Sequence, residues 1–202
     1  RDLHSFPTRR SSDLTNVLSA PLFSGEEKAV DLEQLRSRCP EVVDIAAYYE
    51  KFDAFGAVQY GPAFRGLRRL WRSQGEAVAE VDLDRRAAGG NEGFVIHPAV
   101  LDSCLQSMVA ALATREKDIG GDGFMPFGVE RVVFYGRAPE KVWCHAVMKP
   151  GDSFQQDMFS ASFKIYSPEG RLLCEIVNLT MKKTSRETLE FLKIGQQQYS
   201  VG

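Results

Sequence analysis

The stretch Phe94-Val-Ile-His-Pro-Ala-Val-Leu-Asp-Ser-Cys-Leu-Gln106 decides the fold of this chain. Pro98 suits the first turn of a helix, because its missing N–H would be unpaired there anyway. From Pro98 to about Thr114, apolar residues recur at helical spacing and cover more than one stripe, as in a helix that is buried on most sides. Asp102 and Gln106 are one turn apart and project from the same face. We therefore expect one long, largely buried helix that carries a polar pair.

The acid on this apolar helix is its most informative residue. A buried carboxylic acid must find a partner, keep its proton or meet a ligand. Spacing alone also allows Asp102 to be a solvated or capping residue at the helix edge, because aspartate is rarely fully buried. Both interpretations stay open on the pattern of this helix alone.

Composition places the chain among ordinary globular proteins. It has 202 residues, of which 44% are hydrophobic and 26% charged, with a net charge of −2. This length suits one domain with flanking segments, or two small domains. The charge excludes the basic surface of a nucleic-acid or anionic-membrane binder. A cluster of Arg65, Arg68, Arg69 and Arg72 predicts a solvated strand face, with a carrier-protein docking patch as the alternative.

The cysteines indicate the compartment. Cys39, Cys104, Cys144 and Cys174 are scattered without CxxC spacing, and three of them lie among apolar residues. We interpret them as reduced core cysteines, with neither a disulfide framework nor a metal site. No apolar run approaches membrane-spanning length, and no secretory signal pattern opens the chain. We therefore expect a cytoplasmic location.

The two ends of the chain differ from its middle. Residues 1–14 resemble the in-frame translation of a common sequencing adapter or a disordered tail, so we assign them no function and set His4 aside. Residues 15–40 are interpreted mainly as a linker, with a short helix turn around Leu32 and Leu35. Residues 41–183 are the predicted domain. Residues 184–202 are a second linker that can begin with a short helix to Leu192.

Periodicity predicts the remaining elements. A helix is expected over 43–55, with Asp44 as its N-cap and Gly56 as its stop. The expected strands are 66–73, 76–83, 125–135, 142–148, 158–166 and 171–181, with a loop over 86–93, a loop over 117–123 and a hairpin turn at 167–170. In strand 76–83, apolar and charged residues alternate except at Val78. One long buried helix and about five or six strands in mostly antiparallel runs predict an α+β hot-dog fold, a sheet wrapped around that helix, with a generic α+β sandwich as the alternative.

Three segments together resemble the dehydratase domain of polyketide synthases and animal-type fatty acid synthases. Tyr60-Gly-Pro-Ala-Phe-Arg-Gly-Leu67 is similar to the family's Tyr-Gly-Pro-x-Phe-x-Gly-Leu element. His97-Pro-Ala-Val-Leu-Asp102 with Gln106 is similar to the signature on the helix of its second hot-dog. Met125-Pro-Phe127 through Val132 is similar to its Leu-Pro-Phe strand. The resemblance covers roughly residues 20–190.

The resemblance implies one half of a double hot-dog. In the family, the first half supplies a catalytic histidine in a His-x-x-x-Gly-x-x-x-x-Pro motif and the second half supplies the catalytic aspartate. The histidines of this chain are His4, His97 and His145, and none begins that motif. We therefore expect residues 41–183 to be the second, C-terminal hot-dog, and the isolated chain to be inactive.

The resemblance also implies roles for individual residues. Asp102 would protonate the departing hydroxyl of a β-hydroxyacyl thioester, and Gln106 would orient Asp102 or the substrate. Tyr60 would either bond near the substrate hydroxyl or serve as a buried aromatic. The structural residues of the motifs would be His97, Pro98, Gly61, Pro62, Phe64, Pro126 and Phe127. We expect Phe94, Phe127 and Trp71 in the core and not in a substrate tunnel.

The implied partners follow from this chemistry. The substrate would be carried on the phosphopantetheine of an acyl carrier protein, with no cofactor and no metal bound directly. Further partners would be the missing N-terminal hot-dog, other synthase domains and a second copy in a homodimeric synthase, but neither nucleic acid nor membrane. A free aspartate titrates near ~3.9, and burial of Asp102 should raise its pKa more than the helix dipole lowers it.

Three other functions stay open. A product-template domain would use the same residue pair to guide polyketone cyclisation. A structural or docking module would leave Asp102 solvated with an ordinary pKa. A free-standing hot-dog thioesterase or hydratase would dimerise to complete its site.

Overall fold

The computed structural model describes residues 29–55, 60–89, 93–112, 123–152 and 156–184. In these ranges one antiparallel sheet has the order β1-β2-β3-β6-β7-β8-β4, with β5 also paired to β8. The strands are β1 (Glu41–Val42), β2 (Leu67–Ser73), β3 (Glu76–Asp82), β4 (Gly123–Gly128), β5 (Arg131–Phe134), β6 (Lys141–Met148), β7 (Met158–Tyr166) and β8 (Leu172–Thr184). The helices are α2 (Leu32–Ser37), α3 (Ile45–Phe55), the 3₁₀ turn η1 (Pro62–Phe64), α4 (Arg85–Ala88) and α5 (Pro98–Leu112).

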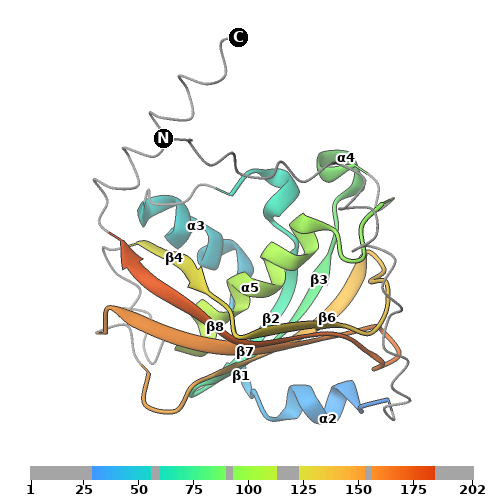
Figure 1. The fold of residues 1–202 in the computed structure, drawn as a ribbon. Coiled ribbons are helices and arrows are strands. Elements are labelled where there is room, and N and C mark those ends of the chain that lie inside the picture. The colour runs from blue at the N-terminus through green and yellow to red at the C-terminus, as the bar shows by residue number, and fades with distance from the viewer. Residues whose placement is uncertain (1–28, 56–59, 90–92, 113–122, 153–155, 185–202) are drawn as a thin grey trace, which may run out of the picture.

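The long helix α5 lies across the concave face of the sheet, and the sheet curves around it (Figure 1). It packs on β2, β3 and β6, and less extensively on β7. Small residues such as Ala77, Ala79 and Ala146 face it from the strands and are fully buried, which lets helix and sheet approach closely. The predicted hot-dog fold, with one central helix starting at Pro98, is confirmed.

The structure of strand β3 explains why apolar and charged residues alternate along it except at Val78. Ala77, Ala79 and Val81 face α5, while Glu76, Glu80 and Asp82 occupy the alternate positions on the convex face. Val78 shares that convex face but is fully buried, because Cys39 and Trp71 pack with it in a second small core. A covered convex face therefore accounts for the apolar residue at a position that alternation expects to be polar.

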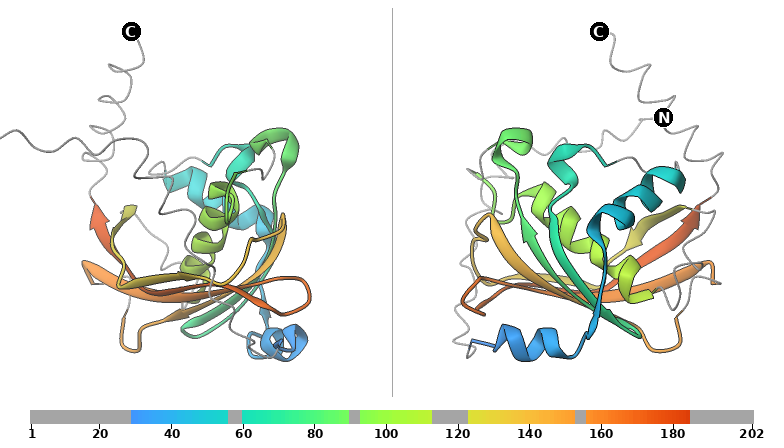
Figure 2. Two further views of the ribbon diagram at one scale, coloured as in Figure 1. Left: turned by 45° about the vertical axis from the view of Figure 1, so that its right-hand side comes forward. Right: turned by 180° about the vertical axis from the view of Figure 1, so that it is seen from behind.

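The cover of the convex face is a strap formed by residues 29–40. Val30 N–H donates to the carbonyl of Gly170 in the β7–β8 turn at 3.0 Å, and α2 then crosses the face opposite to α5 (Figures 1 and 2). Beneath α2, the rings of Trp71 and Trp143 stack with centroids 5.8 Å apart. The short helix turn that the sequence allowed around Leu32 is present. The domain and linker boundaries remain predictions.

The segment 125–135 contains two strands and not the one that was predicted. Residues 174–177 of β8 pair with β5, and residues 180–184 pair with β4. Between them Asn178 has a φ of +49°, and the register of the β7–β8 ladder also shifts at this point. A bulge bends a strand, so β8 turns and its two halves carry separate partners.

Three smaller expectations were wrong. The loop predicted over 86–93 begins inside a helical turn, α4, which Asp84 caps by accepting from Arg86 N–H. Phe94 and Phe127 are 42% and 66% exposed and are not core residues, whereas Trp71 is buried as expected. Phe127 lies on the terminal strand β4, where the Lys182 ammonium lies 5.3 Å from its ring centroid. An apolar residue type does not tell whether a terminal strand is covered.

The start of α3 is as predicted. Asp44 caps α3 by accepting from the N–H groups of Ala46 and Ala47. The predictions for residues 1–14, Gly56, the loop beginning at residue 117 and the C-terminal helix lie outside the described residues. Within the described ranges, no helix is long and apolar enough to cross a membrane.

Candidate active site

Asp102 lies in the second turn of α5 and is half-buried. Burial raises the pKa of its carboxyl above the ordinary value, because the charged form loses hydration, while a hydrogen bond from Gln106 acts in the opposite direction. The net direction is the one expected for an acid that must keep its proton. The i,i+4 spacing predicted that contact, and Gln106 Nε2 donates to Asp102 Oδ2 at 2.8 Å.

Gln106 is the centre of the polar network around the acid. It is 4% exposed, and each side of its amide has a partner. Its Nε2 donates to Asp102 Oδ2 and, at 2.9 Å, to the backbone carbonyl of Phe64, while its Oε1 accepts from the Tyr49 hydroxyl at 3.0 Å. Because the Phe64 carbonyl can only accept, the NH₂ group of the amide must face it. The orientation of the amide is therefore determined by the backbone.

The Tyr60–Leu67 element holds its backbone against α5. Pro62 begins the 3₁₀ turn η1, which directs the Phe64 carbonyl at the helix, whereas the Phe64 ring is 40% exposed. Gly66 follows at a close approach: its N–H donates to Ser103 Oγ at 3.2 Å, and a Cβ there would lie 2.6 Å from that oxygen. The glycine is required by proximity, and the carbonyl of Phe64 contributes more to the site than its ring does.

Tyr60 lies close enough to Asp102 for the aspartate charge to affect it. Burial, and secondarily the charge of Asp102, raises the pKa of the Tyr60 phenol well above its usual value. Its ring packs edge-on against Phe52 and Tyr49, with centroids 5.3 Å and 6.4 Å away. In the described part of the chain, its hydroxyl has no hydrogen-bond partner. Tyr60 is thus a half-buried aromatic near the acid, and its hydrogen bond to a substrate hydroxyl stays a prediction.

The structure places the two described histidines at the start of α5 and on the convex face of the sheet. His97 is buried at the start of α5, where its Nδ1 accepts from the Ala99 N–H at 3.1 Å. The structural role of His97 stays a prediction. His145 lies on the convex face of the sheet, with its Nε2 2.6 Å from Glu76 Oε1. Burial lowers the pKa of the His145 imidazole, while Glu76 opposes that effect.

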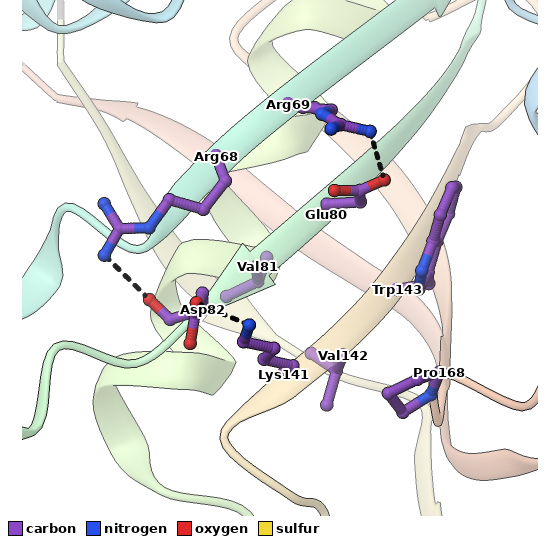
Figure 3. Close-up of a pocket in the computed structure, with 9 residues that line it drawn as sticks. All are labelled: Arg68, Arg69, Glu80, Val81, Asp82, Lys141, Val142, Trp143 and Pro168. Atoms are coloured by element: carbon purple, nitrogen blue, oxygen red, sulfur yellow. Dashed lines mark hydrogen bonds and ion pairs between the residues drawn. The ribbon is translucent and has the colours of Figure 1, made fainter.

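The arginine cluster lies mostly away from the acid. A pocket of about 330 Å³ is lined by Arg68, Arg69, Glu80, Val81, Asp82, Lys141, Val142, Trp143 and Pro168 (Figure 3). Arg69 pairs with Glu80 at 3.3 Å and Lys141 with Asp82 at 3.6 Å, on the face opposite to α5. Exposed, acid-paired cations fit the predicted solvated strand face, and this pocket is not part of the Asp102 site.

The other two arginines of the cluster have acidic partners of their own. Arg72 is largely covered and pairs with Glu41. Arg65 binds both carboxylate oxygens of Asp53, at 2.8 and 3.0 Å.

Sequence reasoning missed three contributors to the site. Tyr48 and Tyr49 were interpreted only as helix periodicity, yet the Tyr48 hydroxyl donates to the Gln106 carbonyl at 2.7 Å and Tyr49 bonds the Gln106 amide. Ser103, next to Asp102 in the chain, bonds Gly66. The two neighbouring phenols in a helix that precedes the Tyr60–Leu67 element were the only signal. In the residues that the structure describes, no group of His, Cys, Asp and Glu could hold a metal ion.

A family model describing the polyketide synthase dehydratase N-terminal domain matches residues 27–191 of this chain. The chain belongs to the polyketide synthase dehydratase family. A dehydratase is a hydro-lyase, and this family forms domains of multidomain polyketide synthases. The description names an N-terminal domain, whereas the motifs around Asp102 resemble the second hot-dog.

Known relatives agree with this assignment. Polyketide synthase GfsE of Streptomyces halstedii is 40% identical over 85 residues, which are 42% of this chain and 2% of GfsE. Polyketide synthase PksN of Bacillus subtilis (strain 168) is 24% identical over 181 residues, 89% of this chain and 3% of PksN. The chain therefore spans only a few per cent of these synthases.

A solved dehydratase has the same fold. The dehydratase domain from the CurK module of the curacin polyketide synthase matches with a TM-score of 0.70 and 29% identity, over 81% of this chain and 55% of that chain. Inactive mutants of the CurK dehydratase carry phenylalanine for a histidine or asparagine for an aspartate. The chain spans about half the length of this solved dehydratase.

Proposed function

We propose that this chain is the acid-bearing half of a polyketide synthase dehydratase. In this proposal Asp102 protonates the hydroxyl that leaves the β-carbon of a β-hydroxyacyl thioester, and an α,β-unsaturated thioester results. The observation that carries it is the half-buried Asp102 carboxyl, which burial keeps protonated to a higher pH than usual and which Gln106 holds at 2.8 Å.

The chemistry requires such an acid. Hydroxide is a poor leaving group, and a positioned acid that protonates it as it departs contributes typically ~10²–10⁴-fold. Once Asp102 has given up its proton, the N–H of Gln106 stabilises the carboxylate that remains. The available Tyr60 phenol, beside the acid, would donate to the same substrate hydroxyl.

The base that removes the α-proton would come from another hot-dog. No His-x-x-x-Gly-x-x-x-x-Pro motif occurs in this sequence. Both described histidines have other contacts, His97 at the start of α5 and His145 with Glu76. The CurK dehydratase has inactive mutants at a histidine and at an aspartate, and this chain spans 55% of its length. These facts favour the second, C-terminal half, although the family model's description names the N-terminal domain.

The remaining parts of the proposal concern partners. The substrate would arrive on the phosphopantetheine of an acyl carrier protein, and the acid–base step would use no cofactor of its own. The missing hot-dog would complete the site beside Asp102, within a synthase that forms a homodimer. The isolated chain would then not catalyse dehydration.

The decisive experiment fuses a His-bearing first hot-dog to this chain and assays a β-hydroxyacyl carrier protein by product mass. We expect loss of one water, and a decrease of about 10²-fold or more for Asp102→Asn. Asp82→Asn is the matched control, because Asp82 lies at the convex-face pocket and should leave the rate unchanged. Full activity of Asp102→Asn, or an aromatic product without an alkene, would contradict the proposal.

A further inference from the structure

One chain of hydrogen bonds links the backbone of β2 to the acid. The Leu67 N–H donates to the Tyr49 hydroxyl at 3.3 Å, and that hydroxyl donates to Gln106 Oε1 at 3.0 Å. Gln106 Nε2 in turn donates to Asp102 Oδ2 at 2.8 Å. Tyr49 is 5% exposed and comes from α3, the helix that also carries Tyr48.

The direction of every bond in this chain is determined at its ends. Leu67 N–H can only donate, so the Tyr49 oxygen accepts there and its own proton is available for Gln106 Oε1. The Phe64 carbonyl can only accept, so Gln106 Nε2 must face it. A flipped amide would set its oxygen against the Phe64 carbonyl and its NH₂ against the Leu67-bonded phenol. Only one arrangement pairs every group.

We infer that Tyr49 is a positioning residue that locks the Gln106 amide, so that Asp102 Oδ2 is the accepting oxygen and the proton of the acid resides on Oδ1. A proton on Oδ2 would oppose the N–H of Gln106, whereas Oδ1 receives no hydrogen bond within the described part of the chain. This inference rests on the proposed function for its catalytic meaning, but the lock itself does not depend on it.

The surroundings of Tyr49 keep the lock rigid. The Arg65 guanidinium lies 5.3 Å from its ring centroid, and Asp53 and the Tyr60 carbonyl hold that guanidinium in place. Burial raises the pKa of the Tyr49 phenol to about 12, so the hydroxyl remains a donor wherever Asp102 titrates. The phenol therefore keeps one geometry and one protonation state.

The neighbouring residue supplies a matched control. The Tyr48 hydroxyl donates to the backbone carbonyl of Gln106 at 2.7 Å, and its side chain is as buried as that of Tyr49. Tyr48→Phe and Tyr49→Phe each remove one buried hydroxyl that bonds the same residue. Only Tyr49→Phe removes a hydrogen bond from the side-chain amide, which then keeps the Phe64 carbonyl as its one backbone partner. Tyr49→Phe also removes the acceptor of the Leu67 N–H, so the Asp102 pKa, and not stability, is the readout that reports the lock.

The first measurement is the titration of the Asp102 carboxyl by ¹³C NMR in the whole chain. A released amide donates less to Oδ2, so Tyr49→Phe should raise the Asp102 pKa by about 0.5–1 unit. Tyr48→Phe should leave it unchanged. Equal pKa values in the two variants would overturn the inference. If Tyr49→Phe does not fold, Gln106→Leu takes its place: it removes the amide that Tyr49 holds, so the Asp102 pKa should rise, and an unchanged pKa would overturn the inference.

The second measurement uses the fused dehydratase. Tyr49→Phe should lower kcat about 10-fold with KM unchanged, and it should add nothing in a Gln106→Leu background, since Tyr49 acts through Gln106. Additive losses would overturn the inference. If Asp102→Asn keeps full activity, the proposed function fails while the titration still decides the lock. The two failures are thus distinguishable.

Discussion

Gly66 and Ser103 lie so close that the Gly66 N–H donates to Ser103 Oγ, and a Cβ on Gly66 would lie 2.6 Å from the same oxygen. This approach joins the Tyr60–Leu67 element to α5, one residue from Asp102. Gly66→Ala should therefore lower the free energy of unfolding by about 1–3 kcal/mol, as overpacking does. Urea denaturation measures it. Gly61→Ala is the control, since a Cβ there meets nothing within 4 Å and Gly61 has an ordinary φ of −66°. Equal losses in both variants would contradict the steric explanation.

The raised pKa of Asp102 predicts a pH dependence of stability. The folded state holds this proton more tightly than the unfolded chain, in which aspartate titrates near ~3.9. Stability should therefore fall as pH rises from the unfolded pKa through the folded pKa, where the unfolded chain binds fewer protons. Asp102→Asn removes this dependence and still accepts from Gln106.

Thermal unfolding of both proteins between about pH 3 and pH 8 checks the prediction, because that window brackets the ordinary aspartate value. The wild type should lose stability relative to Asp102→Asn with increasing pH. A constant difference would mean that the Asp102 carboxyl titrates as in the unfolded chain.

The strap over the convex face predicts different costs at two hairpin glycines. Gly170 has a φ of +81°, and a Cβ there would lie 2.2 Å from the Val30 carbonyl oxygen. Gly75 has a φ of +77° in the β2–β3 turn but has no atom within 4 Å of its Cβ position. The left-handed backbone costs each alanine variant about 1–2 kcal/mol. In urea denaturation, Gly170→Ala should lose more free energy of unfolding than Gly75→Ala, because only the Cβ added at residue 170 would displace the strap. Similar losses would show that Val30 yields freely.

Whether a contact could be predicted from the sequence depended on how many residues separate its two partners along the chain. The Asp102–Gln106 contact and the extent of α5 follow from helix geometry, since both are local. The strands follow from alternation in the same way. The lock by Tyr49 does not, because 57 residues separate it from Gln106 and the contact depends on how α3 lies against α5. A local pattern carries no information on such a crossing.

Errors of prediction arose where burial depends on distant segments. For Val78, the exception to the alternation in strand 76–83, the sequence offered no reason, and the strap that covers this side chain supplies it. Phe127 was expected in the core on the strength of its residue type, yet the terminal strand β4 leaves it exposed. The division of segment 125–135 into β4 and β5 came from a bulge in β8, its partner. In each case the decisive residue lies elsewhere in the sequence.

The cysteines yield a last prediction. Cys39, Cys104, Cys144 and Cys174 are fully buried free thiols. Burial raises the thiol pKa of Cys39 and Cys104, and that of Cys174 to about 12. Because the thiolate is the reactive form, the native chain should react with a thiol-specific disulfide reagent only as fast as it opens. In denaturant all four should react at once, which provides the control. Rapid labelling of the native chain would mean that at least one thiol reaches solvent without unfolding.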